Sequence, residues 1–226
     1  MSLLRNGGLF MSKKKKKKFF QQNQDQVSVG EEEIWKEDKG KEYVEWEKPK
    51  VVVDTALEDD KVIAWKDFDN VYEPGFYGKQ LGDRLELALV EALILLKRGR
   101  IRVLKDGNPM TFEELYNHAG SIDKRLSHRY RVYEDLRERG LVVRTGYKFG
   151  CDYRVYERGV QLKKGPKTAR EHTKWIVFAI PEDYTCSFQE LSRAVRLAHN
   201  IRARMLWSIV DNEGDVTYLQ VTRHKP

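Results

Sequence analysis

The sequence of 226 residues predicts an α+β protein, in which a helical and β-containing N-terminal module precedes a small mixed α/β domain. Amphipathic helical stretches separated by short β runs fill the middle of the chain. From residue 141 onward, short runs of Val, Ile and aromatic residues dominate, with one helical pattern embedded among them at Ser187. We therefore expect a disordered charged tail (1–45), an N-terminal domain (46–120) and a C-terminal domain (121–226).

The tail is marked by its charge pattern. Lys13–Lys18 is an unbroken run of six lysines, and Glu31–Glu33 is a run of three acids. Like charges at this density repel one another and resist compaction, which favours a disordered, solvating segment. The alternative is a nonspecific anchor for phosphates, whose RNA binding would weaken as salt rises.

The N-terminal domain is expected to alternate strands and helices. Residues 51–54, 61–67 and 101–104 are rich in β-forming side chains and predict short strands. A loop is expected around Gly75–Gly78, because glycines interrupt the pattern there. Leucines and an alanine recur on one stripe of 85–98, which predicts an amphipathic helix stopped by Gly99.

Two helices should follow this module. Thr111 and Glu114 form a capping box, which predicts a helix start. A second helix is expected from Ser121 to Gly140, the latter acting as its C-terminal stop. This second helix is basic, and its arginines indicate either a solvated face that complements the helix dipole or a surface that contacts RNA. They are Arg125, Arg129, Arg131, Arg137 and Arg139.

The C-terminal domain is expected to be built mainly from strands. Ser187 and Glu190 form a second capping box, so the embedded helix should begin there. Asp211–Asp215 is a turn signal between two β runs. The predicted strands are 141–145, 152–157, 173–180, 205–210 and 216–221.

Composition limits the function classes. The formal net charge of +7 and a pI near 9.2 indicate a polyanionic partner, with a merely solvated basic surface as the alternative. No apolar run reaches the ~18 residues of a membrane span, so no membrane partner is expected. Two cysteines make neither a disulfide framework nor a zinc quartet, which favours a reducing cytoplasm. Common cofactor motifs are missing, so no cofactor is expected.

An ordered series of motifs resembles the archaeal type of tRNA-splicing (tRNA-intron) endonuclease. The resemblance covers roughly residues 50–222, and its specificity lies in the order of the motifs rather than in any one of them. Upstream, Gly75–Gly78 and Leu89–Gly99 resemble the N-terminal domain of that family. The motifs of the nuclease-like domain are Tyr130–Gly140, Lys148–Glu157, Glu171-His172, Ser192–His199 and Trp207–Tyr218.

The resemblance implies cleavage of precursor tRNA at a bulge–helix–bulge, without a metal ion. The ribose 2′-hydroxyl would attack the adjacent phosphorus and leave a 2′,3′-cyclic phosphate and a 5′-hydroxyl. Such a reaction needs a base, an acid and a cation. The family uses Tyr, His and Lys, and the first two match Tyr156 and His172. A tyrosine base needs nearby positive charge, whereas histidine donates protons near neutral pH. On residue type alone, a packing tyrosine and a surface histidine are the simpler interpretations.

The third position of this site holds Ala203, which cannot supply charge. Arg202 and Arg204 flank it, but alternation along a strand turns both toward the other face. Three interpretations follow: an inactivated variant of a catalytic subunit, a non-cleaving partner subunit, or substitution by a neighbouring arginine. Retention of Tyr156 and His172 favours the first, because a subunit relieved of catalysis need not keep them.

The resemblance also implies RNA contacts outside the cleavage site. Arg196 matches an arginine that stacks on an extruded base, which a guanidinium can do by cation–π contact. Tyr218 lies near the position of a second stacking group. The basic segment between Tyr156 and His172 predicts an added RNA-binding loop with Lys163, Lys164 and Lys167.

Assembly is the last implication. The acidic residues Asp211, Glu213 and Asp215 match a loop that docks into a neighbouring subunit, with an ordinary hairpin turn as the alternative. We expect a homo-oligomer, or a hetero-oligomer with a second endonuclease subunit, and two-fold symmetry suits a substrate with two cut sites. The competing functions are a non-catalytic RNA-binding subunit of the same endonuclease and a basic RNA chaperone.

Overall fold

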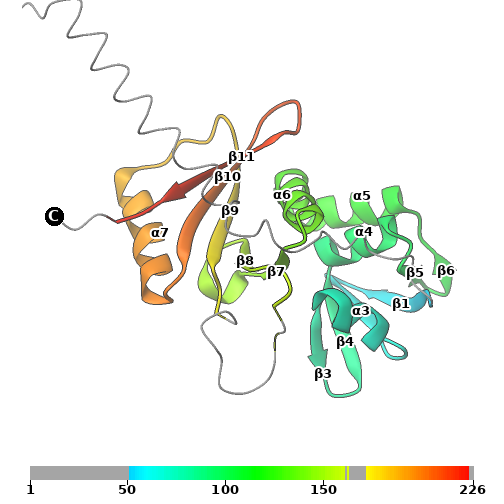
Figure 1. The fold of residues 1–226 in the computed structure, drawn as a ribbon. Coiled ribbons are helices and arrows are strands. Elements are labelled where there is room, and N and C mark those ends of the chain that lie inside the picture. Colours follow the sequence, from blue (N-terminus) through cyan, green and yellow to red (C-terminus); the bar gives the residue numbers. More distant parts are fainter. Residues whose placement is uncertain (1–50, 161, 163–171, 224–226) are drawn as a thin grey trace, which may run out of the picture. The chain divides into compact units, whose positions relative to one another are not determined.

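The computed structural model describes residues 51–160, 162 and 172–223, which all belong to one compact unit (Figure 1). They form two mixed sheets with helices, which confirms the predicted α+β class. The predicted tail (1–45) and the lysines Lys163, Lys164 and Lys167 lie outside the described residues. Among the described residues, no helix is both long and apolar enough to cross a lipid bilayer.

The first sheet forms the N-terminal half of the described chain. Its six strands have the order β3-β4-β2-β1-β5-β6, with β1 and β5 parallel and the other neighbours antiparallel. The strands are β1 (Val53–Glu58), β2 (Lys61–Ala64), β3 (Lys79–Leu81), β4 (Arg84–Ala88), β5 (Ile101–Lys105) and β6 (Asn108–Pro109). The helices are α3 (Asp69–Gly75), α4 (Leu89–Lys97) and α5 (Phe112–Ile122).

Helix α4 is the core of this half. Residues Leu89–Leu95 are all buried, because the helix contacts strands of the sheet on one side and helices α5 and α6 (Leu126–Glu138) on the other. A helix that is apolar on every side is stable only when it is enclosed in this way. Its one buried carboxylate, Glu91, accepts hydrogen bonds from the backbone N–H groups of Gly78 (3.0 Å) and Ala88 (2.9 Å).

The second sheet has the order β11-β10-β9-β8-β7. Strands β9 and β10 are parallel and are joined by the crossover helix α7 (Phe188–Asn200), while the other neighbours are antiparallel. A short 3-10 helix, η1 (Tyr147–Phe149), lies between β7 and β8. The strands are β7 (Val142–Thr145), β8 (Tyr153–Tyr156), β9 (Trp175–Pro181), β10 (Arg204–Val210) and β11 (Val216–Val221).

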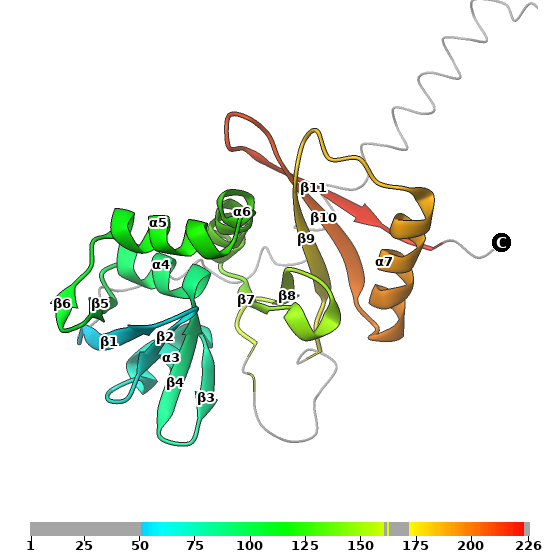
Figure 2. The same cartoon turned by 180° about the vertical axis from the view of Figure 1, so that it is seen from behind.

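Helices α6 and α7 cover opposite faces of the second sheet, as the views in Figures 1 and 2 agree. On the α7 face, Ile176 and Met205 pack with Ala194 and Ala198 of the helix. On the α6 face, the Tyr153 hydroxyl donates to the Arg129 carbonyl at 2.7 Å. Burial on both faces explains why β9 reads as a nearly continuous apolar run rather than as an alternating one.

Two predicted helix starts are wrong, and both capping boxes are confirmed. The helix expected at residue 85 begins at Leu89, because Arg84–Ala88 forms strand β4 with Leu85 and Leu87 facing inward. The helix expected from Ser121 begins at Leu126, because α5 continues through Ile122. The chain breaks at Asp123, which is extended and accepts a hydrogen bond from the Arg125 N–H at 2.9 Å.

The capping boxes at Thr111 and Ser187 each begin a helix, as predicted. The predicted boundary between residues 120 and 121 falls inside α5, and the domain limits themselves stay a prediction.

Candidate functional site

One end of the second sheet brings three chain segments together. Strand β8 ends at Tyr156, β9 begins just after Lys174, and β10 begins just after Ala203. The Lys174 N–H donates to the Val155 carbonyl at 2.9 Å, and the Lys174 carbonyl accepts from the Arg204 N–H at 2.8 Å. Because Val155, Trp175 and Arg204 are paired in register, Tyr156, Lys174 and Ala203 lie abreast.

Tyr156 is 2% exposed and belongs to a buried cluster with Val142 and Val160. Two partly buried side chains, Phe76 and Leu162, pack against this cluster. Phe76 belongs to the N-terminal half of the chain, at the C-terminus of α3. Both halves therefore contribute to the environment of this tyrosine.

His172 is exposed and lies two residues before Lys174, at the entrance to β9. The register therefore places it at the same end of the sheet as Tyr156 and position 203. The residues immediately before it, 163–171, lie outside the described residues.

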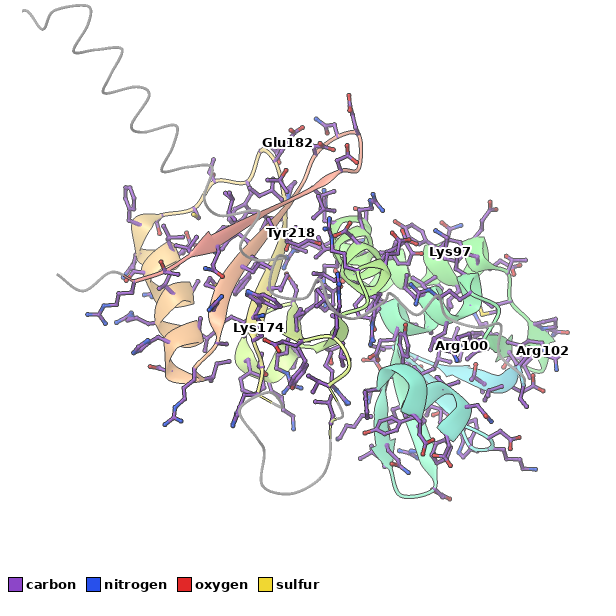
Figure 3. The ribbon with its side chains drawn as sticks, viewed as in Figure 1. Lys97, Arg100, Arg102, Lys174, Glu182 and Tyr218 are labelled. Atoms are coloured by element: carbon purple, nitrogen blue, oxygen red, sulfur yellow. The ribbon has the colours of Figure 1, made fainter. Side chains whose placement is uncertain are left out.

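Lys174 is a cation at this corner that sequence reasoning missed (Figure 3). Its Nζ lies 2.8 Å from Glu157 Oε1 and 4.5 Å from the centre of the Trp175 ring. The side chain is 18% exposed. Two-residue alternation from His172 along an extended chain is the signal that could have found it.

Ala203 is fixed by the turn that ends α7. Arg202 has a left-handed backbone (φ 57°), and its N–H donates to the His199 carbonyl at 3.0 Å. The Ala203 N–H donates to the Ala198 carbonyl at 2.9 Å, which completes a Schellman motif. The Ala203 methyl packs against the apolar cluster under α7. A lysine here would lay its aliphatic stem on the same surface and extend its amine beyond it.

The two predicted base-stacking residues have contrasting surroundings. Arg196 is exposed on α7. Tyr218 is 7% exposed on the opposite face, where its hydroxyl donates to Asp135 Oδ2 at 2.5 Å and its ring lies 5.5 Å from the Arg139 guanidinium. Burial, and then the Asp135 carboxylate, raise the pKa of Tyr218. The structure does not bring the two side chains together, and their RNA contacts stay predictions.

The acidic loop is an ordered turn. Asp211 Oδ1 accepts hydrogen bonds from the N–H groups of Glu213 (3.0 Å) and Asp215 (2.8 Å). The Gly214 carbonyl accepts from Arg131 Nε of α6 at 2.5 Å. Glu213 and Asp215 are exposed at the tip. A role for this loop at a subunit interface stays a prediction.

Arg137 corrects the prediction that the arginines of α6 are either solvated or contact RNA. Its side chain is 1% exposed, and its Nη1 donates to the Gly75 carbonyl at 2.8 Å. Nη2 donates to the Val143 carbonyl at 2.7 Å, and Nε to the Tyr133 hydroxyl at 3.1 Å. The guanidinium also lies 3.9 Å from the Tyr77 ring centre. A buried charge is tolerated because every arm of it is hydrogen-bonded.

In the ranges that the structure describes, no three His, Cys, Asp or Glu side chains gather in a way that could hold a metal ion.

Both halves of the chain match one family. Residues 126–218 match the family described as tRNA intron endonuclease, catalytic C-terminal domain. Residues 53–116 match the tRNA intron endonuclease, N-terminal domain.

Archaeal relatives named tRNA-splicing endonuclease match over the same region. The protein of Thermococcus onnurineus is 35% identical over 156 residues, which is 69% of this chain and 86% of the relative. That of Methanosarcina barkeri is 38% identical over 181 residues, or 78% of this chain and 50% of the relative, so the chain spans about half the length of that protein. That of Nanoarchaeum equitans is 36% identical over 151 residues, which is 67% of this chain and 97% of the relative. These matches confirm the resemblance, and the chain belongs to the tRNA intron endonuclease family.

Proposed function

We propose that this chain is a tRNA-intron endonuclease subunit whose site cleaves precursor tRNA at bulge–helix–bulge splice sites by metal-free transesterification, and that Ala203 lowers or removes this activity. The observation that carries the proposal is the sheet register, which sets Tyr156, the approach to β9 at His172, and position 203 at one end of the sheet. The relatives' name, tRNA-splicing endonuclease, supports the substrate class.

The chemistry has two proton transfers. Tyr156 Oη, as a phenolate, accepts the proton of the ribose 2′-hydroxyl, and O2′ attacks the adjacent phosphorus. The bond from phosphorus to the 5′ oxygen breaks, and His172 donates a proton to that oxygen. The products are a 2′,3′-cyclic phosphate and a 5′-hydroxyl. A phenolate base and a pentavalent phosphorane both require nearby positive charge.

Neighbouring cations are the candidate sources of that positive charge. Ala203 supplies none, and its neighbours Arg202 and Arg204 are exposed. Lys174 is a further candidate, because it lies in the strand between Tyr156 and Ala203, although its amine is paired with Glu157. The variant Lys174→Gln distinguishes Lys174 from the two arginines. Its cleavage rate should fall if Lys174 supplies the charge and should stay unchanged if an arginine does.

Ala203 also favours a second candidate function, a non-catalytic RNA-binding subunit of the same endonuclease. In either case we propose precursor tRNA as the ligand. The functional assembly that we propose is a homo-oligomer, or a hetero-oligomer with a second endonuclease subunit. The cytoplasm is the proposed location, for which the free cysteines Cys151 and Cys186 are the support.

The ends of the cleavage products test the mechanism. A bulge–helix–bulge RNA is incubated with the chain in chelator, and the ends are identified by phosphatase and kinase treatment. The proposal predicts cyclic phosphate and 5′-hydroxyl ends, which Tyr156→Phe and His172→Ala should abolish. Metal-dependent cleavage that leaves a 5′-phosphate refutes the mechanism. Equal binding of unstructured and bulged RNA, without cleavage, would favour a chaperone instead.

A further inference from the structure

A short segment of the N-terminal half, Gly75–Gly78, reaches the surroundings of Tyr156. Within it, Phe76 has a left-handed backbone (φ 53°, ψ 40°) at the end of α3. Bulky side chains rarely adopt this conformation, and it persists only where the surrounding structure enforces it. Strained backbone positions of this kind cluster at functional sites.

Polar contacts from three elements fix the segment. The Gly75 carbonyl accepts from Arg137 Nη1 of α6 at 2.8 Å. The Gly78 carbonyl accepts from Arg144 Nη2 of β7 at 2.6 Å, and the Gly78 N–H donates to Glu91 Oε1 of α4 at 3.0 Å. Both arginines belong to the C-terminal half, so the segment is tied to the sheet that carries Tyr156.

The backbone at the end of the segment is tightly packed against a neighbouring strand. Gly78 has φ 73°, and a Cβ atom there would lie 2.6 Å from the Glu86 carbonyl oxygen. Only glycine fits this close approach of two backbone segments. The position of Phe76 is therefore set at both sides.

Phe76 contacts one aromatic ring and one buried apolar cluster. The Tyr72 ring is 5.7 Å away in an edge-on arrangement (82°). Phe76 also packs against the buried cluster of Val142, Tyr156 and Val160. Phe76 is thus a contribution of the N-terminal half to the apolar packing of the cluster that contains the candidate base.

We propose that Phe76 is a positioning residue that holds the ring of Tyr156 and so fixes the direction of its hydroxyl. This inference rests on the proposed function, in which that hydroxyl must meet a ribose 2′-hydroxyl. Small displacements of a reacting group lower the rate of the chemical step without weakening substrate binding. The N-terminal half then takes part in catalysis through packing, and not only through RNA contact.

The test compares three variants of the full chain, as it stands and with Ala203→Lys. Phe76→Ala removes the ring, and Phe76→Leu keeps apolar bulk. Phe112→Ala is the matched control, because Phe112 is a partly buried aromatic of the same half whose ring contacts are Tyr116 and Tyr130 (5.9 Å each). Single-turnover cleavage rate and the Kd for bulge–helix–bulge RNA are measured separately.

The expected result is a split between rate and affinity. Phe76→Ala should lower the single-turnover rate at least tenfold with Kd within threefold, and Phe76→Leu should recover most of the rate. Phe112→Ala should leave the single-turnover rate within threefold, even if it lowers the melting temperature as much as Phe76→Ala does. A rate that Phe76→Ala leaves unchanged, while Tyr156→Phe abolishes it, overturns the inference and leaves the proposed function standing. Cleavage that survives Tyr156→Phe refutes the proposed function itself.

A second readout does not require cleavage. In protein with carbon-13-labelled tyrosine, the Tyr156 ring signals are assigned from their loss in Tyr156→Phe. Phe76→Ala should shift these signals and narrow them as the ring flips faster, whereas Phe112→Ala should leave them in place. Tyr156 signals that are the same in Phe76→Ala and in the parent protein contradict the proposal.

Discussion

Helices α6 and α7 cover opposite faces of one sheet, and both carry arginines, but the side chains have different surroundings on the two helices. On α6, Arg137 is buried and Arg129 lies 3.2 Å from Asp152, while Arg139 at the C-cap pairs with Asp135 at 2.7 Å. On α7, Arg193 and Arg196 are exposed. The difference teaches that a count of arginines overstates the charge available to RNA, because Arg129 and Arg139 are paired with carboxylates and buried Arg137 holds the two halves of the chain together.

The largest effect on stability is expected at Arg137. Arg137→Met should lower the free energy of unfolding by about 3–5 kcal/mol, because the carbonyls of Gly75 and Val143 and the Tyr133 hydroxyl lose a buried charged donor. Urea denaturation at neutral pH measures the loss. A change below about 1 kcal/mol would mean that α6 does not depend on this contact.

Arg196 should behave in the opposite way. Arg196→Ala should leave the free energy of unfolding within about 0.5 kcal/mol. The Kd for bulge–helix–bulge RNA should rise about 5- to 30-fold, as expected for the loss of one stacked base or cation–π contact worth about 1–2 kcal/mol.

Arg193→Ala is the control for this variant, since it removes an exposed charge one turn away. It should weaken binding less, and mainly by reducing the dependence of Kd on salt. If the two variants lose the same RNA affinity and change its salt dependence equally, Arg196 makes only an ordinary phosphate contact.

Tyr218 gives a smaller and pH-dependent effect. Tyr218→Phe should cost about 1 kcal/mol near neutral pH, because the buried hydroxyl donates to the partly buried Asp135 carboxylate. Burial and Asp135 raise the pKa of Tyr218 in the folded protein, so its contribution is present below the unfolded value of about 10 and is lost as pH rises above that value.

Measured from pH 7 to 11, the stability of the parent protein should therefore fall more steeply above pH 10 than that of Tyr218→Phe. Parallel curves would show that this hydroxyl is not buried in solution, and would return Tyr218 to the exposed surface where a base could stack on it.

Local signals predicted much of the fold. The capping boxes at Thr111 and Ser187 begin helices, and the predicted strand 216–221 matches β11. Strand β4 escaped prediction because Leu85 continues the helical stripe of α4 by coincidence, although it also alternates with Leu87. Arg137 escaped because a charged side chain is seldom buried, and its carbonyl partners lie 62 and 6 residues away in the chain.

The candidate site was less accessible to sequence reasoning. Tyr156 and His172 were predicted through a family resemblance, because a tyrosine in a strand and a surface histidine are ordinary by themselves. Lys174 was missed although its alternation with His172 is visible in the sequence, and the sheet register sets it beside Tyr156. Phe76 emerges only from contacts between the two halves of the chain. Such contacts depend on tertiary packing, which no local pattern contains.

The charge at position 203 tests the central claim most directly. Single-turnover cleavage of a bulge–helix–bulge RNA is measured for the chain, for Ala203→Lys, and for Ala203→Lys combined with Tyr156→Phe. The account predicts that Ala203→Lys raises the rate at least tenfold, because its amine supplies the missing charge beside Tyr156. The gain should disappear with Tyr156→Phe. No gain from Ala203→Lys, or a gain that survives without the Tyr156 hydroxyl, would contradict a catalytic centre built on Tyr156, His172 and position 203.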